Sequence, residues 1–156
     1  MEQSSAGRGK PVERVTSATP EQVWAVLADG WTFGSWVVGA SRVRAVEESW
    51  PSRGRRVHHS VGSWPAVIDD ETLVVESEPN RRLVLQARIR PLGEARVEIT
   101  LEPTAGGTRL TMSEDFTNGP GSLVPRAGRQ AGLRVRNAEA LHRLALMAER
   151  RTRPER

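Results

Sequence analysis

The middle of the chain is a run of short segments in which apolar and polar residues alternate, and this run limits the possible folds more than any other feature. Alternation with a period of two is typical of strands that bury one face. Short turns rich in Gly, Pro and Asn separate neighbouring segments, and connections of this length join antiparallel strands. We therefore predict a meander of about six strands, at residues 41–48, 55–62, 72–78, 81–90, 94–102 and 108–116.

One further strand and one or two short helices are expected before this meander. Residues 12–17 alternate in the same way. Thr19, Pro20 and Glu21 then form a helix start, because Thr can cap a helix, Pro suits its first position and Glu favours its first turn. We predict a helix at residues 20–29 and a short helix or helical turn at residues 31–38.

The last long segment has the periodicity of an amphipathic helix. It runs from residue 123 to about residue 150, with an Arg-rich face opposite an apolar face. Pro125, Gly128 and Gly132 weaken its first turns, so the helical pattern is strongest from residue 133 onward. The expected apolar stripe consists of Ala127, Ala131, Ala138, Leu141, Leu144, Ala145 and Ala148.

These elements predict an α+β fold in which a curved antiparallel sheet of about seven strands buries the stripe of one long helix. A chain of 156 residues suits one hydrophobic core. We expect one domain at residues 11–150. The polar segments at residues 1–10 and 151–156 are expected to be disordered tails.

The order of elements and the string TPEQVWAVLADGWTFGSW at residues 19–36 resemble the START/Bet v 1-like (SRPBCC) superfamily, in particular its polyketide cyclase/dehydrase-like group. The resemblance covers about residues 11–150 and includes the Glu78-Pro79 turn and Asn137 on the final helix. It implies a helix-grip fold that holds a small hydrophobic, lipid-like or polycyclic ligand between sheet and helix. Proteins on this scaffold include cyclases, aromatases and carriers, so the resemblance implies the fold and leaves the chemistry open.

Strand parity places two polar residues, His59 and Glu114, among the side chains that should face the helix. His59 can act as a general acid or base or bind a ligand carbonyl, because its ordinary pKa lies near neutrality. The alternative is a partly buried histidine whose hydrogen bonds are satisfied by the protein itself. Glu114 can be a base whose pKa is raised by burial, or a carboxylate that faces water or pairs with an arginine.

Apolar and aromatic residues on the same inward face are the expected ligand contacts. Trp31, Trp36 and Trp64 can stack on a flat ligand or pack in the ordinary way, and the loop at residues 64–70 is long enough to form a lid. Asn137 can bind the ligand or bridge helix to sheet. The expected contacts are Trp31, Trp36, Val57, Trp64, Leu85, Ala87, Ala95, Val97, Ile99, Leu110, Met112, Asn137 and Leu141.

Several kinds of site are not expected. The chain has no cysteine, which removes disulfides, thiolate nucleophiles and zinc–thiolate sites. His58 and His59 are adjacent on a strand, so they point to opposite faces and cannot share a metal ion. We expect no metal and no cofactor, because no nucleotide or phosphate loop is present either. No segment of the sequence approaches the roughly 18 consecutive apolar residues of a membrane span. The polar amino terminus favours a cytoplasmic location for the protein.

Three functions therefore remain open for a monomer or homodimer. The first is a carrier or sensor of a hydrophobic molecule, and the second is a cyclase or aromatase that uses His59 or Glu114. The third is an adaptor that binds a protein or nucleic acid through its basic helix. The chain after residue 125 contains nine arginines and only three glutamates. Only one of the 23 basic residues is lysine. This bias suggests Arg-rich codon usage and disfavours a selected nucleic-acid surface.

Overall fold

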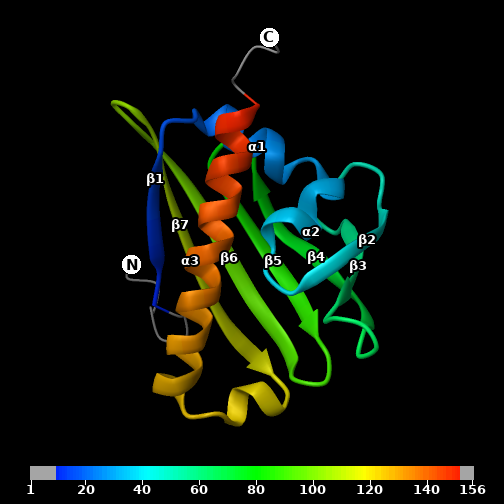
Figure 1. Cartoon of the computed structure of the whole chain (residues 1–156). Helices are drawn as coiled ribbons and strands as arrows, with labels where there is room; N and C mark the ends of the chain where they lie inside the picture. Colours follow the sequence, from blue (N-terminus) through cyan, green and yellow to red (C-terminus); the bar gives the residue numbers. More distant parts are fainter. Residues whose placement is uncertain (1–9, 152–156) are drawn as a thin grey trace.

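The computed structural model describes residues 10–151 and shows seven antiparallel strands curved round one long helix (Figure 1). This arrangement confirms the predicted helix-grip fold. The predicted tails lie outside the described residues, except for Lys10 and Arg151. The strands lie in the order β1-β7-β6-β5-β4-β3-β2. They are β1 (Val12–Thr16), β2 (Ala40–Val46), β3 (Arg56–Val61), β4 (Ile68–Glu78), β5 (Arg82–Ile89), β6 (Gly93–Thr104) and β7 (Gly107–Asn118).

The first and last strands of the chain are neighbours in the sheet. β1 pairs with β7, and Val12 lies opposite Met112. The strands from β2 to β7 pair in chain order, as expected for a meander.

The predicted first helix is confirmed as α1 (Pro20–Leu27). Thr19 caps it, because its hydroxyl accepts from the Gln22 backbone N–H at 3.2 Å and the Gln22 side chain accepts from the Thr19 N–H at 2.7 Å. The short helix predicted at residues 31–38 is divided into a 3₁₀ turn, η1 (Gly30–Thr32), and α2 (Phe33–Trp36). A second 3₁₀ turn, η2 (Pro120–Leu123), precedes the last helix.

The last helix, α3 (Arg126–Arg150), lies across the concave face of the sheet (Figure 1). Its predicted stripe is wrong in the first half, because Ala127, Ala131 and Ala138 are exposed. Gln130 takes one of the inward positions there: its amide nitrogen lies 3.4 Å from the Glu114 carbonyl and its amide oxygen lies 2.9 Å from the Lys10 backbone nitrogen. The buried residues are Gln130, Leu133, Asn137, Ala140, Leu141, Leu144, Ala145 and Ala148.

The loop predicted at residues 64–70 is present but ends earlier than predicted, since β4 begins at Ile68. Asp69 and Asp70 lie inside this strand, although aspartate favours turns, because other groups of the protein donate hydrogen bonds to both carboxylates. The Ser60 hydroxyl donates to Asp69 at 2.8 Å. The buried Asp70 carboxylate accepts from the backbone N–H groups of Glu71 and Arg90, each at 3.0 Å.

A hydrophobic core fills the space between α1, the second half of α3 and the sheet. Leu27, Leu83, Ile99, Leu110 and Leu144 are among its fully buried members. Burial of these apolar side chains is the main force that holds α3 against the sheet. No helix within residues 10–151 is long and apolar enough to span a membrane.

Candidate functional site

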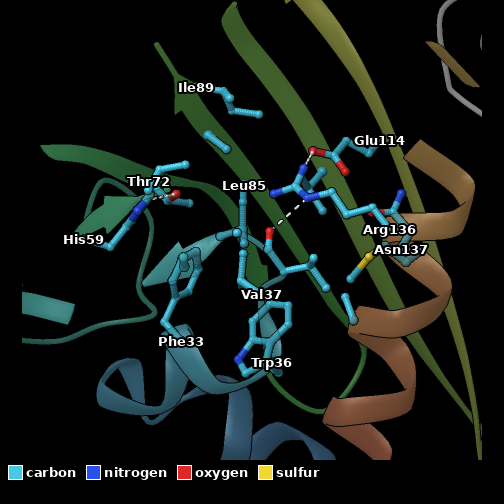
Figure 2. Close-up of a pocket in the computed structure, with 18 of the residues that line it drawn as sticks. Phe33, Trp36, Val37, His59, Thr72, Leu85, Ile89, Glu114, Arg136 and Asn137 are labelled. Carbon is cyan, nitrogen blue, oxygen red and sulfur yellow. Dashed lines mark hydrogen bonds and ion pairs between the residues drawn. The ribbon is translucent and has the colours of Figure 1, made fainter. Parts of the chain in front are cut away.

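A cavity lies beyond this core, between α2, the sheet and the middle of α3 (Figure 2). It contains about 600 Å³ of empty space, counting open solvent at its mouth, and the centres of water molecules can reach about 60 Å³ of it. The lining residues are Phe33, Trp36, Val37, Val38, Gly39, Ala40, His59, Val61, Thr72, Leu85, Ala87, Arg88, Ile89, Val97, Met112, Glu114, Arg136, Asn137 and Ala140.

Most of the wall is apolar. Leu85, Val97 and Met112 come from three neighbouring strands, because alternate residues of β5, β6 and β7 point to the concave face. Ala87 and Ala140 are small, and their short side chains leave the space open. An apolar cavity with a few polar groups is the usual form of a small-molecule site.

His59 is the polar group on the β3 side of the cavity. It is 4% exposed, and its Nε2 lies 2.9 Å from the Thr72 hydroxyl. The Phe33 ring stacks on the imidazole with 5.0 Å between centroids. Its Nδ1 is buried and has no hydrogen-bond partner within the described part of the chain.

Burial lowers the pKa of His59 to about 4, and the positive charge of Arg44 adds to this effect while Asp70 opposes it. The imidazole is therefore neutral at pH 7. In this state one ring nitrogen donates and the other accepts, so His59 can offer one hydrogen bond to a ligand.

Glu114 is the polar group on the opposite side, near the end of β7, with Leu85 between it and His59 in Figure 2. It is 3% exposed, and Arg136 Nη1 lies 2.9 Å from its Oε1. Burial raises the pKa of Glu114, whereas the charge of Arg136 and a hydrogen bond from the Asn137 side chain oppose that rise. A guanidinium at this distance favours the charged carboxylate.

Arg136 joins three parts of the site. Its Nε donates to the Val38 carbonyl at 3.0 Å, in the connection between α2 and β2, while its Nη1 contacts Glu114 on β7. Both contacts are drawn as dashed lines in Figure 2. The next carboxylate, Asp115, points elsewhere and pairs with Arg129 at 2.8 Å.

The structure brings eight of the residues proposed from the sequence to the cavity wall. The others lie elsewhere. Val57, Ala95, Ile99, Leu110 and Leu141 are buried but do not line the cavity. Trp31 and Trp64 are 62% and 88% exposed and do not reach it. The eight are Trp36, His59, Leu85, Ala87, Val97, Met112, Glu114 and Asn137.

The lining residues that sequence reasoning missed include Phe33, Thr72, Arg136 and Ala140. The last two carried a usable signal, because residues 136, 137 and 140 lie on one side of a helix with 3.6 residues per turn. Phe33 and Thr72 carried none, since their roles depend on contact with His59.

His58 points to the outer face, as its position next to His59 predicts. Its ring nitrogens lie 3.6 Å from carboxylate oxygens of Glu47 and Glu71. Within residues 10–151, no three His, Cys, Asp or Glu side chains are grouped so that they could hold a metal ion.

Comparison with known proteins gives a consistent picture. The family model described as "Polyketide cyclase / dehydrase and lipid transport" matches residues 12–149. A crystal structure of a protein from Nitrosomonas europaea has a TM-score of 0.72 and 17% identity, over 95% of this chain and 98% of its own. None of the curated protein sequences matches the chain.

Two other solved structures are similar at the level of the fold. The di-domain ARO/CYC StfQ from the steffimycin biosynthetic pathway has a TM-score of 0.72 and 14% identity, over 91% of this chain and 50% of that one. Ara h 8.0201 has a TM-score of 0.69 and 11% identity, over 90% of this chain and 96% of its own.

Proposed function

The chain belongs to the polyketide cyclase/dehydrase and lipid transport family, and from this we propose that it binds a small hydrophobic molecule in the cavity between α2, the sheet and α3. The observation that carries the proposal is the wall itself. Apolar side chains form most of the wall, and four of its polar residues, His59, Thr72, Glu114 and Asn137, are buried. Such a wall favours an apolar ligand body with one or two oxygen atoms.

The cavity must widen to admit a ring system, because the centres of water molecules can reach only about 60 Å³ of it. The connection at residues 37–39 lies outside the helices and strands. The Val37 N–H donates to the Phe33 carbonyl at 3.0 Å and the Ala40 N–H to the Val37 carbonyl at 3.3 Å, while Arg136 donates to the Val38 carbonyl at 3.0 Å and the Gly62 N–H to the Gly39 carbonyl at 3.1 Å. We infer that this connection moves outward when the ligand enters.

A second candidate is cyclase chemistry. It is supported by Glu114, a buried carboxylate whose pKa burial raises, and by the unpartnered Nδ1 of His59. In such a reaction a base removes a proton from a ligand carbon between two carbonyls, and that carbon then attacks a third carbonyl of the same ligand. The π bond of the attacked carbonyl breaks, and the alkoxide that results takes up the proton held by the base. The fold of StfQ, whose name includes ARO/CYC, is consistent with this candidate.

The binding proposal is tested by native mass spectrometry of freshly purified protein, followed by organic extraction and a titration with 2-naphthol. Ala87→Phe fills the cavity and should abolish both the adduct and 2-naphthol binding. Ala105→Phe makes the same change in the exposed turn between β6 and β7 and should have no effect. An empty wild-type protein that also fails to bind 2-naphthol would contradict the proposal.

The cyclase candidate is tested separately with a reactive poly-β-ketone. Wild-type protein should change the distribution of cyclised products, and Glu114→Gln or His59→Gln should return it to that of the spontaneous reaction. Products that are identical with and without protein would leave binding as the function.

A further inference from the structure

We propose that the cavity selects neutral ligands with a carbonyl or hydroxyl oxygen over ligands with a carboxylate. The inference rests on the proposed function and specifies the chemical class of its ligand. It follows from the pairing of charges in the wall, because the cation best placed to receive an anionic ligand already has a buried counterion.

Four titratable side chains line the cavity. Glu114 and Arg136 form the 2.9 Å ion pair. Arg88 lies at the rim with 40% of its side chain exposed, and its guanidinium lies 3.8 Å from Glu71 and 4.0 Å from Glu94. His59 is neutral at pH 7. The interior part of the wall therefore has no net charge.

A carboxylate that approached Arg136 would also approach Glu114. The two anions would compete for one guanidinium in a space with little water, where like charges repel strongly. One of them would lose its partner or take up a proton. Either outcome weakens binding of the anion.

An uncharged oxygen avoids this conflict. A guanidinium carries five N–H groups, and the contacts of Arg136 with Val38 and Glu114 use its Nε and its Nη1. The remaining N–H groups can donate to a carbonyl or hydroxyl oxygen while the pair with Glu114 stays intact. At the other side of the cavity, the neutral imidazole of His59 adds a hydrogen-bonding group without adding charge.

The test compares probes that share one ring system. Wild-type protein is titrated at pH 7 with 2-naphthol, methyl 2-naphthoate and 2-naphthoate, and binding is followed by fluorescence. We expect the two neutral probes to bind at least about tenfold more tightly than the carboxylate. This comparison needs no variant.

Glu114→Gln tests the cause. It frees Arg136, so 2-naphthoate should gain at least about tenfold in affinity relative to 2-naphthol. Glu102→Gln removes a carboxylate from an exposed pair with Arg109 on the same sheet and should keep the wild-type ratio. Tighter or equal binding of 2-naphthoate by the wild type, or an unchanged ratio in Glu114→Gln, would overturn the inference and leave the proposed function standing. If no probe binds the wild type, the proposed function itself fails.

Discussion

Replacing Arg136 by methionine should destabilise the protein in a way that depends on pH. The substitution keeps most of the side-chain length but leaves the buried Glu114 without its cation. Removing one partner of a buried pair costs about 3–5 kcal/mol, and because 31% of the Arg136 side chain is exposed we take the lower end of that range. The lost hydrogen bond to the Val38 carbonyl adds about 1 kcal/mol.

The pH dependence follows from the carboxylate. Burial already raises the pKa of Glu114, and loss of Arg136 raises it further. A carboxyl group with a raised folded-state pKa binds its proton more tightly in the folded protein, so its destabilising effect is small at low pH and grows as the pH rises through that pKa. Urea unfolding followed by tryptophan fluorescence should give a loss of about 4 kcal/mol at pH 8 and a clearly smaller loss at pH 5.

Two further proteins show whether this reasoning is right. Arg143→Met breaks an exposed pair with Glu139 on the same helix and should cost about 0.5 kcal/mol or less at both pH values. Adding Glu114→Gln to Arg136→Met should recover most of the loss at pH 8, because no buried charge remains. A loss in Arg136→Met that matches the Arg143→Met control, or that is equal at both pH values, would refute the argument.

Three other outcomes can be measured with the same unfolding assay. The lowered pKa of His59 stabilises the fold above about pH 6.5, and this contribution of about 3 kcal/mol should be lost as the pH falls towards 4. His59→Gln should flatten that slope, and an unchanged slope would assign it to other groups. Leu144→Ala should cost about 2–5 kcal/mol because the side chain is fully buried, whereas Leu123→Ala, at 83% exposure, should cost under about 0.5 kcal/mol; similar losses would count against the described core. Thr19→Ala removes the hydroxyl of the capping box and should cost about 1 kcal/mol, while a neutral result would mean that the cap is not formed in solution.

The architecture could be predicted because its signals are local. Alternation fixes which face of a strand is buried, and short turns fix antiparallel neighbours, so the meander and its inward positions followed from the sequence. The capping residues at Thr19 located α1 in the same way. None of these signals depends on distant contacts.

The sequence could not predict whether an inward-facing side chain lines the cavity or is covered by the core. Leu85 and Ile99 both point to the concave face, yet Leu85 lines the cavity whereas Ile99 is covered by core side chains. Parity distinguishes the two faces of a strand but not positions along it. The way in which α1, α2 and α3 fill the concave face decides which residues stay open.

The polar part of the site was the hardest to predict. An amphipathic pattern assigns arginine to solvent, whereas Arg136 turns inward because Glu114, 22 residues earlier, offers a counterion and the Val38 carbonyl accepts a hydrogen bond. For the same reason the predicted apolar stripe of α3 wrongly included alanines such as Ala131. Gln130 and Asn137 are buried there through hydrogen-bonding partners on the sheet or near the start of β1.

The pairing of the first strand with the last has a consequence for the order in which the molecule folds. Val12 meets Met112, so β1 has no partner until the chain has been made past residue 112. Contacts between such distant segments close slowly, because a long stretch of chain must be ordered before they form. During synthesis the hairpins from β2 to β6 can form first, and the sheet acquires its edge at β1 only when β7 is released. The site depends on this late step, because β7 carries Glu114 and α3, which follows it, carries Arg136.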